Sequence, residues 1–174
     1  PEITEPDPMS YLSQVSGSRY QYIENIPDVF HSANRLFAVT KKITSLKLNQ
    51  KPDIFHLTTP WPVQVPGVKT VVTIHDLIPL KVPFTTLDMK NHFYHLFKWA
   101  AESSDMIFSV SEHTKNDIME IYGIPEDKIQ VTYQSYKKSE TVTSEEDDEI
   151  YLKAKKLAKE KYVLFVGNIE PKKN

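Results

Sequence analysis

The sequence predicts an α/β fold with a doubly wound, parallel sheet of the Rossmann-like type. Short runs rich in β-branched residues alternate along the chain with amphipathic helical patterns, as right-handed crossover units require. Residues 68–74 (VKTVVTI) are too continuously apolar to have a wet face, which is typical of a central strand in a parallel sheet. The length of 174 residues is enough for one domain with a hydrophobic core.

Composition excludes several classes of protein. The 21 basic and 23 acidic residues give a net charge of -2, and no long basic stretch would follow a phosphate backbone, so nucleic acid is not an expected partner. The absence of cysteine excludes disulfides, thiolate metal sites and cysteine nucleophiles, and it favours a cytoplasmic location. No apolar run is long enough for a membrane span. Because residues 1–8 contain no initiator methionine and no signal-peptide pattern, we expect the chain to begin inside a longer protein.

The first half of the chain contains one predicted helix and two predicted strands. The first thirty residues are punctuated by proline and glycine and show no clean period, which indicates irregular structure. Residues 32–47 are predicted to be helical, because apolar residues recur there at intervals of three and four: Leu36, Val39, Ile43 and Leu46. Residues 52–57 and 68–74 are predicted to be strands.

The next predicted helix begins at a capping box in residues 85–88 (TTLD) and ends near Ser103. Its apolar residues follow helical spacing: Met89, Phe93, Leu96, Phe97, Ala100 and Ala101. After a predicted strand at 105–110, Ser111 is expected to cap a helix that buries Ile118, Ile121 and Tyr122 and ends at Gly123, since Pro125 blocks continuation.

Three further elements are predicted near the end of the chain. Residues 128–133 (KIQVTY) and 162–166 (YVLFV) are predicted strands. Ser144 can cap a helix with an acidic start, followed by lysines at 153, 155, 156 and 159, and both features suit the helix dipole.

Candidate site residues follow from the rule that ligands lie outside the carboxyl ends of parallel strands. Four strand exits carry polar or special residues: 58–62, 75–76, 111–114 and 167–174. His75 and Asp76 directly follow the central strand and are the catalytic candidates, although each residue could instead be structural, with Asp76 capping a turn. The other candidates on this side of the cleft are Thr58, Trp61, Ser111 and His113.

Two further patterns carry weaker predictions. His92 and His95 lie three apart on a predicted helix, but the sequence shows no further ligands to complete a metal site, so no metal is expected. Gly167 with Lys172 and Lys173 is typical of a phosphate-binding loop, since glycine allows close backbone approach and lysine supplies charge. A solvated surface turn would show the same residues.

Three segments together resemble glycosyltransferase family four in order and spacing. They are 72–79 (VTIHDLIP), 110–117 (VSEHTKND) running into 122–125 (YGIP), and 164–174 (LFVGNIEPKKN). The resemblance implies a GT-B protein, in which two Rossmann-like domains face each other across a cleft. It matches His75 to the family's cleft histidine, Gly167 to the first glycine of the donor loop, and Lys173 to that loop's basic diphosphate contact.

The resemblance also implies a domain division. Residues 1–143 would form an acceptor-side domain that lacks its amino-terminal part, and residues 144–160 an interdomain connector helix. Residues 161–174 would form the first strand and phosphate loop of a truncated donor-binding domain. We expect the chain alone to be inactive, and its unpaired last strand to be disordered, to pack on the first domain or to pair with another copy.

The sequence departs from the family at three positions of the expected site. Many members carry an arginine where Asn168 stands and a second basic residue, usually arginine, where Lys172 stands. The usual Asn-Gly turn is replaced by residues 133–136 (YQSY), at the expected hinge.

The implied reaction transfers a sugar from a nucleoside diphosphate sugar to a hydroxyl of a carbohydrate, lipid-linked or other acceptor, with retention of configuration and without a metal. Positive charge at the donor loop would stabilise the departing diphosphate. Two alternatives stay open: a nucleotide- or sugar-binding module without catalysis, and a degenerate structural relative on the same fold.

Overall fold

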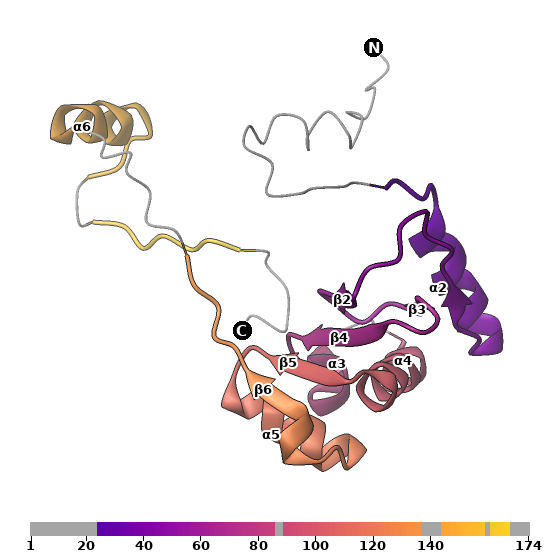
Figure 1. Cartoon of the computed structure of the whole chain (residues 1–174). Coiled ribbons are helices and arrows are strands. Elements are labelled where there is room, and N and C mark those ends of the chain that lie inside the picture. Colours follow the sequence, from indigo (N-terminus) through magenta and orange to yellow (C-terminus); the bar gives the residue numbers. More distant parts are fainter. Residues whose placement is uncertain (1–23, 86–88, 137–143, 159–160, 168–174) are drawn as a thin grey trace.

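The computed structural model describes residues 24–85, 89–136, 144–158 and 161–167. Its centre is a four-stranded sheet of order β2-β4-β5-β6 (Figure 1). The strands are β2 Ile54–Leu57, β4 Lys69–Ile74, β5 Met106–Ser109 and β6 Ile129–Val131. All three pairings are parallel, and β4 lies between two neighbours. The predicted α/β class with a parallel, Rossmann-like sheet is confirmed, as is the internal position of the strand at 68–74.

Helices connect β4 to β5 and β5 to β6. Between β4 and β5 lie α3 Ile78–Lys81, the 3-10 turn η1 Pro83–Thr85 and α4 Lys90–Ser103. Between β5 and β6 lie α5 Glu112–Tyr122 and the 3-10 turn η2 Glu126–Lys128. The helices bury one sheet face, on which Val72, Ile74 and Ile107 are 0% exposed. Burial of each such side chain stabilises the fold by about 1.5 to 3 kcal/mol.

Both ends of α5 form as the sequence predicts. The Ser111 hydroxyl accepts a hydrogen bond from the backbone N–H of Thr114 at 3.1 Å, which satisfies a donor in the first turn. Gly123 adopts a left-handed conformation with φ 66°, and its N–H donates to the Met119 carbonyl at 2.9 Å. This geometry favours glycine, because a Cβ is strained at positive φ.

Gly123→Ala is expected to lower the free energy of unfolding by about 1 to 2 kcal/mol. A Cβ at Gly123 would meet no atom within 4 Å, so the cost comes from the backbone conformation and not from a clash. Urea unfolding of both proteins measures the difference. Asn116→Ala, at an exposed position of the same helix, is the control and is expected to be neutral. Equal stability of Gly123→Ala and wild type would contradict the conformational argument.

The predicted helix at 32–47 is wrong in its boundaries and in its buried face. The observed helix, α2, is Val29–Thr40, and Lys41 ends it in a left-handed conformation with φ 58°. The following residues enter a second parallel pair, β1 Thr44–Ser45 with β3 Val63–Gln64. Ala33 and Phe37 are the buried residues of α2, whereas the predicted Leu36 and Val39 are 42% and 85% exposed. Strand pairing with β3 overrides a local helical period here.

The start of α4 also differs from its prediction. Thr85 belongs to η1, the helix begins only after Met89, and its first turn has no side-chain cap. Residues 86–88 lie outside the described residues. Met89 is 67% exposed, while His92, which the apolar pattern omitted, is 8% exposed. His92 joins the buried face because its ring packs edge-on against Phe37, with the ring centroids 5.3 Å apart.

At the carboxyl end, α6 Glu145–Ala154 begins at the predicted cap, where Ser144 Oγ accepts from Asp147 N at 3.1 Å. Figure 1 shows α6 away from the sheet. The predicted strand at 162–166 is not formed: 161–167 contains no strand, and Val163 is 97% exposed. A strand requires a neighbour for its backbone groups, and these residues have none among the described ones. The domain boundaries remain predictions, and the irregular structure expected for the first residues lies mostly outside the described ranges.

Candidate functional site

The carboxyl ends of β2, β4 and β6 meet at the side chain of His75. Its Nε2 lies 3.0 Å from the carbonyl oxygen of Thr58, and its Nδ1 lies 3.3 Å from the side-chain nitrogen of Gln134. A carbonyl can only accept and an amide NH₂ can only donate, so Nε2 carries the proton and Nδ1 is the acceptor. The exits of two other strands therefore hold the exposed His75 imidazole in one orientation.

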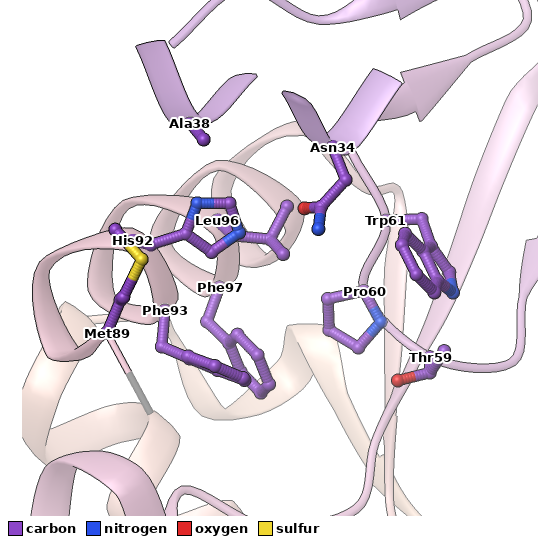
Figure 2. Close-up of a pocket in the computed structure, with 10 residues that line it drawn as sticks. All are labelled: Asn34, Ala38, Thr59, Pro60, Trp61, Met89, His92, Phe93, Leu96 and Phe97. Carbon is purple, nitrogen blue, oxygen red and sulfur yellow. The ribbon is translucent and has the colours of Figure 1, made fainter. Parts of the chain in front are cut away.

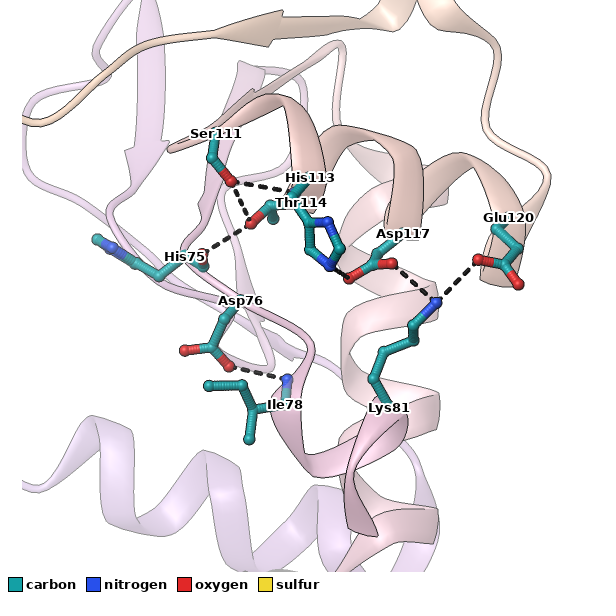
Figure 3. A network of polar contacts seen from close by, with 9 residues as sticks. All are labelled: His75, Asp76, Ile78, Lys81, Ser111, His113, Thr114, Asp117 and Glu120. Carbon is teal, nitrogen blue, oxygen red and sulfur yellow. Dashed lines mark hydrogen bonds and ion pairs between the residues drawn. The ribbon is translucent and has the colours of Figure 1, made fainter. Parts of the chain in front are cut away.

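The backbone of His75 is attached to the first turn of α5 (Figure 3). Thr114 Oγ1 donates to the His75 carbonyl at 3.1 Å and lies 3.1 Å from Ser111 Oγ, which can donate to it in turn. Thr114 is only 6% exposed. Ser111, a predicted cleft residue, is thus half-buried and acts as a helix cap that also supports the Thr114 hydroxyl.

Thr114→Val is expected to lower the free energy of unfolding by about 1 to 3 kcal/mol, because the isosteric side chain leaves the His75 carbonyl without its donor. Urea unfolding measures the loss. Thr114→Ser is the matched control, since it keeps the hydroxyl and is expected to retain more stability than the valine variant. A valine variant as stable as wild type would show that the bond contributes nothing.

Asp76 lies next to His75 and is exposed, as an approachable carboxylate must be. Its Oδ1 accepts a hydrogen bond from the backbone N–H of Ile78 at 3.0 Å, at the start of α3. This contact is the turn-capping role that the sequence left open for Asp76. His75 therefore has the stronger structural claim to contact a ligand.

The structure separates His113 from His75. The His113 imidazole points along α5 toward Asp117, with 3.7 Å between Nε2 and Oδ2 (Figure 3). Asp117 is 7% exposed and also pairs with Lys81 at 2.9 Å, and Lys81 pairs with Glu120 at 2.9 Å. Hydrogen bonds to Glu120 and then Asp117 raise the pKa of Lys81 above its ordinary value. His113 therefore lies beside the ion pairs of Asp117, Lys81 and Glu120 and not at the edge where His75 lies.

Trp61 lies in the loop after β2, beside a cavity of about 510 Å³ between α2 and α4 (Figure 2). Thr59 and Pro60, from the same loop, and Asn34, from α2, line this cavity. Of the predicted cleft residues, Thr58 is thus at the His75 site through its carbonyl, while Trp61 is in the adjoining cavity.

His92 lines the same cavity from α4, and its Nδ1 is buried without a hydrogen-bond partner in the described part of the chain. Burial, and secondly the positive charge of Lys41, lower the pKa of His92 below its ordinary value. Since an unpartnered N–H costs more than an unpartnered lone pair next to a cation, the favoured form is neutral with the proton on Nε2. Among the described residues, no group of three His, Asp or Glu side chains could hold a metal ion.

The lowered pKa of His92 predicts a loss of stability in acid. The unfolded chain binds this proton more readily than the folded protein, so stability is complete above the ordinary pKa of 6.5 and declines as the pH falls below it. Urea unfolding between about pH 7.5 and pH 5.5 measures this slope. We expect His92→Phe to flatten it and His95→Phe, at an exposed position of α4, to leave it unchanged. Equal slopes in all three proteins would contradict the assignment.

The predicted diphosphate loop is largely outside the described residues. Gly167, at its start, is exposed, whereas Asn168, Lys172 and Lys173 lie beyond the described ranges. Their role as diphosphate contacts stays a prediction.

Sequence reasoning did not assign Gln134 or Asn34 to a site, and it placed Thr114 in the candidate loop at 111–114 without giving it a role. Gln134 could have been found, because it follows β6 as His75 follows β4. Asn34 lies on a helix and carries no sequence feature that distinguishes it from surface residues. Across the described ranges, no helix is long and apolar enough to cross a membrane.

Comparison with known proteins adds a family and one relative. The family model described as Glycosyltransferase Family 4 matches residues 5–135, which ends before the segment at 164–174. O-antigen chain mannosyltransferase RfbU of Salmonella typhimurium is 30% identical over 103 residues, which are 59% of this chain and 26% of that protein. The chain thus spans about a quarter of the length of this curated relative. No solved structure matches.

Proposed function

The chain belongs to glycosyltransferase family 4, and from this premise we propose that the whole protein transfers a sugar from a nucleoside diphosphate sugar to an acceptor hydroxyl. We propose further that transfer retains the anomeric configuration and that the protein has the two-domain GT-B architecture. The described sheet then supplies the acceptor side of the cleft. A cytoplasmic location is part of the same proposal and is supported by the absence of cysteine.

The observation that carries the proposal is the meeting of three strand exits at an exposed imidazole. A ligand above this edge of the sheet would meet the exposed imidazole of His75, whose position is fixed from the exits of two other strands. The bond between His75 Nδ1 and Gln134 is long, at 3.3 Å, so a sugar hydroxyl can replace it as the donor at little cost. His75 would then orient the transferred sugar through Nδ1, while the Thr58 carbonyl keeps the proton on Nε2.

The reaction of the donor also requires that the protein stabilise the departing nucleoside diphosphate. Departure of the nucleoside diphosphate builds negative charge, so donors and cations fixed at that position stabilise the transition state more than the bound substrate. Gly167, Asn168, Lys172 and Lys173 are the proposed contacts. No metal is needed in this scheme, because the lysines supply the positive charge.

The test is a donor screen and a transfer assay on the full-length protein. A bound nucleotide sugar raises the melting temperature by mass action, and GDP-mannose is the first compound to test because the relative is named a mannosyltransferase. Nuclear magnetic resonance of the product then determines whether the anomeric configuration is retained. Absence of both stabilisation and transfer, across guanosine, uridine and adenosine diphosphate sugars, would overturn the proposal.

A sugar- or nucleotide-binding module is the second candidate. It is favoured by one observation: both ring nitrogens of His75 already have protein partners, which is also what a structural histidine shows. This candidate predicts donor binding with no transfer to any acceptor.

A further inference from the structure

The cavity between α2 and α4 has an unusual combination of walls. Trp61, Phe93 and Phe97 supply aromatic surface, and Asn34, Thr59 and His92 supply polar groups (Figure 2). Lys, Arg, Asp and Glu are absent from the described residues that line it. The cavity of about 510 Å³ lies in the size range of small-molecule sites.

The polar groups of this cavity come from separate elements and face a common space. Figure 2 shows the His92 imidazole reaching from α4 toward the side of the cavity where the Asn34 amide projects from α2. Only 8% of the His92 surface is exposed, and its Nδ1 has no hydrogen-bond partner within the described part of the chain. Ser109 Oγ and Tyr122 Oη are also buried without partners in the described part of the chain, and His92 differs from them because it lines the cavity.

The residues that line the cavity indicate which class of ligand it would bind. A phosphate or carboxylate would find no cationic side chain among the described residues that line the cavity, which is unfavourable. A purely apolar chain would leave the amide of Asn34 and Nε2 of His92 without hydrogen-bond partners. A neutral sugar ring fits both demands, because its C–H face packs against aromatic rings while its hydroxyl groups donate to and accept from planar polar side chains.

We propose that this cavity is a binding site for a neutral sugar residue of the acceptor, separate from the position where transfer occurs. The proposal rests on the proposed function. The loop at 58–61 joins the two places, since Thr58 holds His75 while Thr59 and Trp61 line the cavity. An acceptor of several sugar units could therefore be anchored at one unit and glycosylated at another, which would make the cavity a determinant of acceptor length.

Binding of methyl glycosides to the 174-residue chain tests the proposal without any donor. Saturation-transfer nuclear magnetic resonance is recorded with the methyl glycosides of mannose, glucose and galactose, and titration gives the dissociation constant. We expect at least one glycoside to bind saturably, at about 1 to 10 mM, as is reasonable for a small uncharged ligand with few hydrogen bonds. His92→Phe and Asn34→Ala are each expected to weaken binding roughly tenfold or more.

His95→Phe is the matched control, because it changes a histidine of the same helix that does not line the cavity. Circular dichroism establishes that each variant is folded, and Asn34→Ala keeps the test valid if His92→Phe fails to fold. Three results would overturn the proposal: no saturable binding of any glycoside, binding that neither cavity variant weakens, or binding of an aliphatic alcohol in place of sugars. Because no donor is present, these results are independent of whether the full-length protein transfers sugar.

Discussion

His75→Ala in the full-length protein is expected to lower the turnover number by roughly 100-fold or more, because it would remove the group that we propose to orient the transferred sugar. The imidazole is exposed at the meeting point of three strand exits, and its Nδ1 is an acceptor with one long bond to Gln134. The melting temperature should change little, since the side chain buries little apolar surface. Turnover and melting temperature are measured on the same preparation.

A structural role for His75 predicts the opposite pair of results. Loss of its bond to the Thr58 carbonyl would then lower stability by about 1 to 3 kcal/mol and leave the turnover number of the folded fraction unchanged. A destabilised variant with normal turnover would rule out the catalytic role. His56→Ala is the matched control, because His56 is also exposed, lies within the adjacent strand β2 and bonds one side chain, Thr73, at 2.8 Å. We expect His56→Ala to retain turnover.

Elements marked by local chemistry could be predicted from the sequence. Ser111 caps the start of α5 and Gly123 caps its end. Both could be predicted, because a helix needs a hydrogen-bond acceptor at its first turn and often ends at a residue in the left-handed conformation, and both requirements are local. The central strands could be predicted because their short runs are rich in β-branched residues, as in β4, where Val72 and Ile74 are buried. His75 could be predicted as a candidate because parallel strands bring their carboxyl ends to one edge.

Features that depend on distant partners could not be predicted. The end of α2 and the short strand β1 depend on pairing with Val63 and Gln64, and two-residue strands have no period of their own. His92 is buried by Phe37 of another helix, whereas a pattern of apolar residues treats histidine as polar. The contacts that fix His75 come from Thr58, Thr114 and Gln134, which are 17, 39 and 59 residues away. A pattern within a short stretch of sequence cannot predict contacts between residues so far apart in the chain.

Lys173→Ala in the full-length enzyme is expected to lower kcat/KM for the donor by roughly 10- to 150-fold, the effect of losing about 1.5 to 3 kcal/mol from a hydrogen bond to a charged group. The resemblance to family 4 matches Lys173 to the basic diphosphate contact. Because Asn168 stands where many members carry arginine, fewer cations would share the diphosphate in the proposed loop, so each should matter more. Lys173→Arg keeps the charge and is expected to retain part of the activity.

Lys172→Ala is the matched control for this prediction, since it removes a neighbouring charge of the same kind whose match to the family is looser. A smaller loss for Lys172→Ala than for Lys173→Ala would show that position, and not total charge, determines the effect. A loss that disappears at high salt would instead indicate general attraction of the anionic donor, because screening weakens distant charges more than direct contacts. Wild-type kinetics of both variants at subsaturating donor would show that the diphosphate binds elsewhere, and the donor loop would then have to be sought in another part of the protein.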